Sequence, residues 1–407
     1  EAALRFVRSH FGLPDLEQTI VGARELAESY ILDILSIAPD QNSQEFFFRP
    51  EMMDRSKDGA GGVPLRKDED LRRLFEATRR GNYPLVRCYS GTSDLIKWAE
   101  MLQGVKNAWG AVPLCWYSEL DGRSKRPLVD AISENQATIK WYAEHGVPVE
   151  VTDSHQWALR NAGDTIEVAS AYIAALNAKL LGAKHYVQQY MLNTPPGTSA
   201  TMDVAKMLAK ATYVENLQDA SFHCYRMIRT GLQLLSANAD VAKGQLAASL
   251  QVGMALKPHI VHVVGHSEGD HAALPTEIIE SCRIAEGVIR YSMISPLPIE
   301  RDPEVQSRKL ELMADVDFLL ASIKELGSGS TGSPFCNPDV LGKAVSVGLL
   351  DAPQLKGTVA PGRIRTAMVD GACRAVHPQT GRVLREVGRI EMLRRVTGDI
   401  KREIMEP

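Results

Sequence analysis

Short apolar runs recur along the chain, and a helix-length segment separates each run from the next. The clearest runs lie at residues 84–89, 112–117, 148–153, 185–190, 222–226 and 259–265. Strands that alternate with helices at this spacing form β-α units and a parallel sheet. Polar and aromatic residues gather where these runs end. The pattern predicts an α/β protein with a TIM-type (β/α)8 barrel, whose active site lies at the carboxyl ends of its strands.

The segments before and after these runs complete the expected architecture. Residues 17–37 carry a helical stripe of apolar residues, and residues 45–49 are expected to form a strand. A long helix is expected near 302–327, then a short helix, a hairpin at 364–384 and a basic C-terminal helix. We therefore divide the chain into an N-terminal helical segment (1–40), the barrel (41–295) and a C-terminal helical and hairpin extension (296–407).

Composition excludes several classes of protein. The 407 residues suffice for one large barrel with additions, and their net charge of −4 argues against a nucleic-acid partner. No apolar run reaches the roughly 18–20 residues that cross a bilayer, so we expect no membrane association. The six cysteines form no Cys-x-x-Cys pair. We expect them to be reduced and buried, as in a cytoplasmic protein.

Several runs together resemble the large subunit of glutamate mutase, an adenosylcobalamin-dependent methylaspartate mutase. Residues 84–94, Pro-Leu-Val-Arg-Cys-Tyr-Ser-Gly-Thr-Ser-Asp, are similar to its Pro-Leu-x-x-Arg-His-Gly-Thr-Pro-Asp stretch. The segments at 141–147, 264–276, 342–353 and 369–374 follow in the matching order. The resemblance covers roughly residues 40–390, and its weight lies in this shared order because no single motif is specific alone.

The resemblance implies the catalytic subunit of a carbon-skeleton mutase that acts on a small acid by radical chemistry. It implies adenosylcobalamin, shared with a small subunit that carries an Asp-x-His-x-x-Gly motif, and a homodimer of large subunits within a heterotetramer. The run Asp-Ser-His-Gln-Trp-Ala at 153–158 lacks the glycine of that motif, so we expect no cobalamin ligand there. His266 and Asp270 align with a lysine and a glutamate that contact the adenosyl ribose in the family, and they are the cofactor-binding candidates.

Substrate recognition is where the chain departs from this family, which grips two carboxylates with three arginines. Arg49 keeps one of those positions, and Arg87 and Tyr89 lie close to a second. With His223, which follows in the matching order, these residues are the substrate-binding candidates. The incomplete arginine set favours a substrate other than glutamate, with one carboxylate rather than two.

Three further residues are the catalytic candidates. Tyr190 aligns with a tyrosine of the family. Tyr117 and Glu119 belong to an apolar and aromatic run, 109–119, that replaces the glycine-rich acidic segment with which the family contacts its amino acid.

Other interpretations stay open. The chain can be another barrel enzyme, such as a corrinoid-linked methyltransferase or an aldolase-type lyase, although no strand end carries the lysine that an aldolase normally uses. It can also be a non-catalytic mutase paralogue that serves as an assembly partner. His155, His223 and His262 lie on different strands without an H-x-x-x-H or H-E-x-x-H pattern, so we expect no metal.

Overall fold

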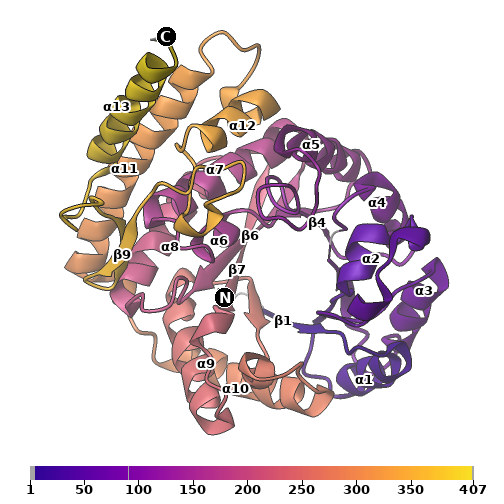
Figure 1. Cartoon of the computed structure of the whole chain (residues 1–407). Coiled ribbons are helices and arrows are strands. Elements are labelled where there is room, and N and C mark those ends of the chain that lie inside the picture. Colours follow the sequence, from indigo (N-terminus) through magenta and orange to yellow (C-terminus); the bar gives the residue numbers. More distant parts are fainter. Residues whose placement is uncertain (1–4, 90, 406–407) are drawn as a thin grey trace.

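The computed structural model describes residues 5–89 and 91–405, with side chains as far as residue 395. Eight parallel strands form a nearly closed barrel, in the order β3-β2-β1-β8-β7-β6-β5-β4, and helices surround it (Figure 1). This confirms the predicted barrel. The strands are β1 (Phe6–Phe11), β2 (Ile34–Ile37), β3 (Leu85–Cys88), β4 (Gly110–Val112), β5 (Val149–Val151), β6 (His185–Leu192), β7 (His223–Thr230) and β8 (Ile260–Val263).

Helices follow most of the strands, and the longer ones cover the outer face of the barrel. Those up to residue 294 are α1 (Leu16–Glu28), α2 (Gln41–Phe46), α3 (Asp68–Ala77), α4 (Leu95–Gln103), α5 (Leu128–Glu144), α6 (Ser154–Ala158), α7 (Asp164–Leu180), α8 (Ala200–Glu215), α9 (Ala239–Gly253) and α10 (Pro275–Ile294). In the described part of the chain, every helix is too short or too polar to span a bilayer.

Two hydrogen bonds close the barrel where β3 and β4 do not form a regular ladder. The backbone N–H of Ala108 donates to the carbonyl of Val86 at 2.8 Å. The N–H of Cys88 donates to the side-chain oxygen of Asn107, also at 2.8 Å. The segment before β4 therefore satisfies backbone groups that an open sheet edge would leave unpaired.

The chain before residue 40 differs from the predicted helical segment, because it contributes two strands to the barrel. β1 pairs in parallel with both β2 and β8. The apolar pattern misses β1 because Arg8 and His10 alternate with Val7 and Phe11, so no continuous apolar run forms. The helical stripe also ends earlier than predicted, since Tyr30 has a φ of 58° and stops the helix before β2 begins.

Residues 45–49 are not the predicted strand. Asp40 caps α2 by accepting the N–H of Ser43 at 2.8 Å, and the helix runs to Phe46. The apolar run then packs against the helix layer, where the ring of Phe47 lies 5.5 Å from that of Trp98. Its apolar residues thus serve the core and not a sheet.

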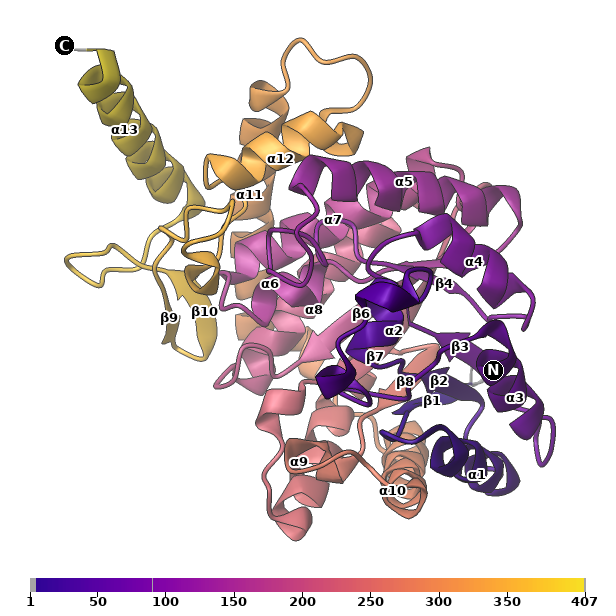
Figure 2. The ribbon, with the colours of Figure 1, turned by 45° about the vertical axis from the view of Figure 1, so that its right-hand side comes forward.

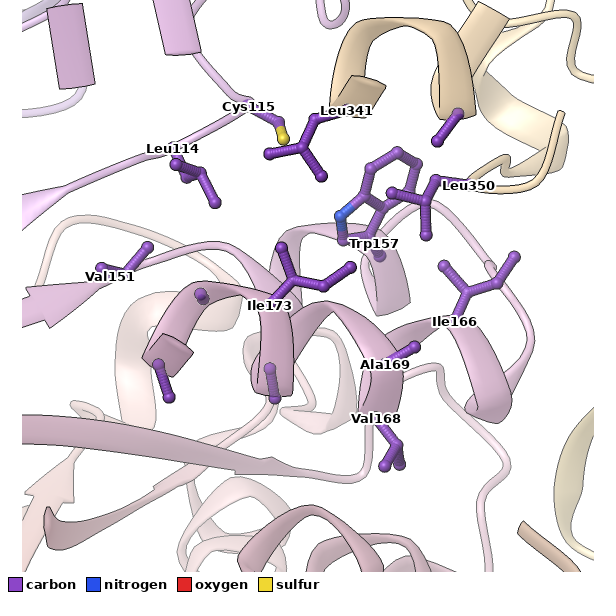
Figure 3. Packing of buried hydrophobic residues seen from close by; sticks show 14 of the residues in the cluster. Leu114, Cys115, Val151, Trp157, Ile166, Val168, Ala169, Ile173, Leu341 and Leu350 are labelled. Carbon is purple, nitrogen blue, oxygen red and sulfur yellow. The ribbon is translucent and has the colours of Figure 1, made fainter. Parts of the chain in front are cut away.

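The C-terminal extension has the predicted elements. It contains α11 (Pro303–Leu326), α12 (Pro338–Ser346), the antiparallel pair β9 (Thr366–Val369) and β10 (Ala372–Ala375), and α13 (Glu386–Met405). Figure 2 shows these elements on one side of the barrel. Leu341 and Leu350 pack with Trp157 and Ile166 in one hydrophobic cluster, so the extension buttresses the region that follows β5 (Figure 3).

Candidate functional site

A cavity of about 790 Å³ opens at the carboxyl ends of the strands. This is the face on which barrel enzymes carry their active sites. Tyr89, Thr152, Met191 and Arg229 reach it from four different strands or the residues just after them. Loops and short helices supply the mouth, with Gln41, Gln44, Glu45, Lys57, Tyr117, Asp121, Arg123, Lys125, His155, Gln156 and Gln233.

The floor of the cavity is built on a buried ionic triad. Arg87 Nη2 donates to Glu150 Oε2 at 2.8 Å, and Arg8 Nη1 lies 3.7 Å from the same oxygen. Trp109 Nε1 donates to that oxygen at 2.7 Å. Burial disfavours the ionised form of Glu150, but the two arginines and these hydrogen bonds outweigh it and lower its pKa. Glu150 is therefore an anion between two cations, and the triad carries one net positive charge.

Arg229 adds a second positive charge; its charge acts on the buried carboxyl of Glu268, where it opposes the rise in pKa that burial causes. It is the next-to-last residue of β7, and its side chain lines the cavity. Within the described residues its side chain forms no ion pair, and its buried Nε has no hydrogen-bond partner. A guanidinium in this state is suited to bind a carboxylate or another small anion.

The histidines around this floor are neutral. Tyr89 and His10 share a hydrogen bond of 2.6 Å between the hydroxyl and Nε2, and the His10 ring meets His262 edge-on at 4.2 Å. Burial, with Arg8 as the next cause, holds the pKa values of His10 and His262 well below the ordinary range. Burial and Arg229 do the same for His155 at the cavity wall. These rings offer hydrogen bonds and no charge.

Three of the predicted residues belong to this region. Tyr89 and Tyr117 line the cavity, and the guanidinium of Arg123 lies 4.5 Å from the centre of the Tyr117 ring. Burial raises the pKa of Tyr117, so its hydroxyl stays protonated at neutral pH. Arg87 points into the barrel beneath the cavity, where it pairs with Glu150.

The structure places three other predicted residues away from the cavity. Tyr190 lies on the outer face of β6, because Gln189 and Met191 take the inward positions of an alternating strand. His223 is the first residue of β7 and is exposed at the amino end of the barrel, so its prediction at a strand's carboxyl end is wrong. Glu119 accepts the N–H of Leu128 at 2.9 Å and thereby caps α5.

Arg49, His266 and Asp270 also lie outside the lining of the cavity. Arg49 pairs with Asp94 at 3.3 Å and leaves 41% of its side chain exposed. His266 is buried against α10, where its Nδ1 shares a 2.9 Å hydrogen bond with the Ser281 hydroxyl. Asp270 is exposed and bonds to the neighbouring histidine. Their predicted roles in binding stay predictions.

The sequence interpretation missed the residues that define the floor. Glu150 had a visible signal, since a glutamate between two valines of a buried strand must point to the lumen. Arg229 was hidden because the predicted strand ends at residue 226, whereas β7 continues to Thr230. Arg8 lies on β1, which the apolar pattern did not reveal. Among the described residues, no group of three or more histidine, cysteine or acidic side chains is arranged to hold a metal ion.

Comparison with known proteins adds little to this geometry. No protein-family model and no curated protein matches the chain. A truncated 3-deoxy-D-arabino-heptulosonate 7-phosphate synthase from Thermotoga maritima is 13% identical over 72% of this chain and 88% of its own, with a TM-score of 0.41. HMG-CoA lyase from Brucella melitensis is 13% identical over 76% and 97% of the two chains, with a TM-score of 0.41. A Rubisco-like protein from Rhodopseudomonas palustris is 12% identical over 69% and 64%, with a TM-score of 0.38. Likeness at this level carries no argument about activity.

Proposed function

We propose that this chain is the catalytic subunit of an adenosylcobalamin-dependent carbon-skeleton mutase that acts on a small carboxylic or amino acid other than glutamate. The observation that carries the proposal is Arg229, an unpaired guanidinium inside a cavity at the carboxyl ends of the barrel strands. The resemblance to glutamate mutase over roughly residues 40–390 supports the reaction class.

Arg229 would hold the carboxylate of the substrate. The cavity is walled by barrel strands, so the charge of this arginine is less screened than at a surface. Gln189, whose buried Nε2 has no partner among the described residues, and the hydroxyl of Tyr89 offer further hydrogen bonds. These groups would orient the acid for the reaction.

We propose that the cavity also receives the adenosyl part of the cofactor. Its volume of about 790 Å³ exceeds the need of a small acid, and its mouth presents the amides of Gln41, Gln44 and Gln233 to a hydroxyl-rich group. When bound, the cofactor supplies the radical that abstracts a substrate hydrogen. His266 and Asp270 do not reach the cavity, so these mouth residues fit the ribose better. We further propose that a small Asp-x-His-x-x-Gly subunit holds the corrin, in a heterotetramer built on a homodimer of this chain.

The test is to mix the chain with such a small subunit and adenosylcobalamin, and to add a panel of small acids. We expect a stable complex and a cob(II)alamin signal in electron paramagnetic resonance with an acid that has one carboxylate. Arg229→Gln should raise the acid concentration that gives half of the maximal signal about a hundredfold, because a charged hydrogen bond to the substrate is lost. Arg290→Gln, at an arginine that is 76% exposed, is the control and should leave it unchanged.

The outcomes separate the alternatives. A complex without a radical signal on any acid would favour the non-catalytic assembly partner. No complex under any corrinoid loading would exclude the mutase and leave another barrel enzyme, such as a lyase.

A further inference from the structure

Glu150 lies between the cavity and two arginines that do not themselves reach it. Glu150 borders the cavity, whereas Arg8 and Arg87 lie beneath it, and all three side chains are at most 1% exposed. One oxygen, Oε2, receives the hydrogen bonds of Arg87 and Trp109 and faces Arg8. The carboxylate of Glu150 thus occupies the position where an anion from the cavity would meet both guanidinium groups.

Arg8 and Arg87 have hydrogen-bond donors that Glu150 does not pair. The Nε and Nη1 atoms of Arg87 are buried and have no hydrogen-bond partner among the described residues. Arg8 directs its Nε to Ser36 and one Nη1 bond to the sulfur of Met227, which is a weak acceptor. Two buried guanidinium groups need an anion nearby, because a buried charge without a partner is strongly unfavourable.

We propose that Glu150 is a specificity-determining residue, an internal carboxylate that takes the place of a second substrate carboxylate. This inference rests on the proposed function, in which Arg229 holds the first carboxylate. A second carboxylate on the substrate would find the arginine pair already neutralised in part and would approach Glu150, a like charge. The cavity therefore selects acids that carry a single negative charge.

The matched probes are butanoate and succinate, which differ by a terminal methyl group or a terminal carboxylate. Calorimetric titration of the wild type should show butanoate binding at least about tenfold more tightly than succinate, since like charges in one site repel. Glu150→Ala should reverse that preference, because truncation opens the arginine pair to the second carboxylate. Glu304→Ala is the control: Glu304 is exposed on α11 and lies outside the cavity lining, so its removal should keep the preference of the wild type.

A second measurement covers loss of stability in the alanine variant. Removing Glu150 leaves two buried cations, so the melting temperature should fall. Added acetate, which matches the missing carboxylate, should raise the melting temperature of Glu150→Ala more than that of the wild type or Glu304→Ala. If the alanine variant does not fold, Glu150→Gln takes its place, because it keeps an acceptor for Trp109 and removes the charge. A higher succinate-to-butanoate affinity ratio than in the wild type would support the role of Glu150, and an unchanged ratio would contradict it.

The failures of the two proposals are distinguishable. If the wild type binds neither probe, the anion site of the proposed function is wrong. The same holds if Arg229→Gln binds both probes with the affinity of the wild type. If butanoate binding depends on Arg229 but the Glu150 variants keep the wild-type ratio and acetate rescues nothing, only the role of Glu150 is wrong.

Discussion

Replacing Asp153 by asparagine is expected to remove a pH-dependent loss of stability. Asp153 follows β5 next to the cavity wall and is 2% exposed. Its carboxyl accepts hydrogen bonds from Trp157 Nε1 at 3.1 Å and from the N–H of Cys115 at 3.4 Å. Burial outweighs these bonds and raises the pKa of Asp153 from 3.8 to about 7. The folded protein therefore keeps a proton that the unfolded chain releases.

The sign and size of the effect follow from this difference. Between pH 3.8 and about 7 the folded state binds more protons than the unfolded state, so the free energy of unfolding falls as the pH rises through this window. The full difference corresponds to roughly 4 kcal/mol, of which about 3 kcal/mol is lost between pH 5 and pH 8. Asparagine cannot ionise, so the variant should lack this loss. The amide NH2 of the asparagine would face one of the two donors, Trp157 Nε1 or the N–H of Cys115, which lowers the free energy of unfolding by about 1–3 kcal/mol at every pH.

Urea unfolding at pH 5 and pH 8 measures the difference. From pH 5 to pH 8 the free energy of unfolding of the wild type should fall by about 3 kcal/mol more than that of Asp153→Asn. Asp54→Asn is the control, because Asp54 is exposed and its hydrogen bonds with Ser56 lower its pKa, which puts its titration below this window. Equal losses in the wild type and Asp153→Asn would refute the inference that Asp153 is protonated in the folded protein at pH 5.

Three further substitutions test the packing around the barrel. Tyr190→Phe removes a buried hydroxyl that has no partner, so the free energy of unfolding should stay the same or rise by up to about 1 kcal/mol; a clear loss would reveal an unrecognised bond. Lys206→Met should cost about 3–5 kcal/mol in urea unfolding, because it strips Glu167 of a buried partner 2.9 Å away; a neutral effect would contradict the buried network. Gly110→Ala would place a methyl group 2.2 Å from the Tyr142 ring and should lower the melting temperature by an amount equivalent to about 1–3 kcal/mol, whereas an unchanged value would contradict this close packing.

Much of the fold is predictable because the residues that face the helix layer are apolar in most barrel strands. The runs at 185–190 and 259–265 contain residues of β6 and β8, which are buried and read as strands without ambiguity. The apolar pattern did not predict β1, because its lumen-facing residues, Arg8 and His10, are polar. This has a physical reason: the lumen of the barrel holds charged groups, which Arg8 of β1, Arg87 of β3 and Glu150 of β5 supply, and the polar neighbours of Arg8 leave β1 without an apolar run.

The site was less predictable because its geometry depends on strand bounds and on side-chain direction. β7 begins at His223 and continues to Thr230, beyond the predicted run at 222–226, so His223 lies at the amino end of the barrel and Arg229 at the carboxyl end. A shift of one residue separates Gln189 in the cavity from Tyr190 in the helix layer. The pairing of Glu150 with Arg8 joins residues from distant parts of the chain, which no local pattern reports.

The most direct test of the account is the affinity of butanoate for the wild type and for Arg229→Gln, measured by calorimetric titration with Arg290→Gln as the control. The account predicts that Arg229→Gln weakens binding about a hundredfold, because this guanidinium lies in the cavity wall without an ion pair among the described residues, while the control binds as the wild type does. Equal affinities in the wild type and Arg229→Gln would contradict the claim that the barrel cavity holds the substrate carboxylate.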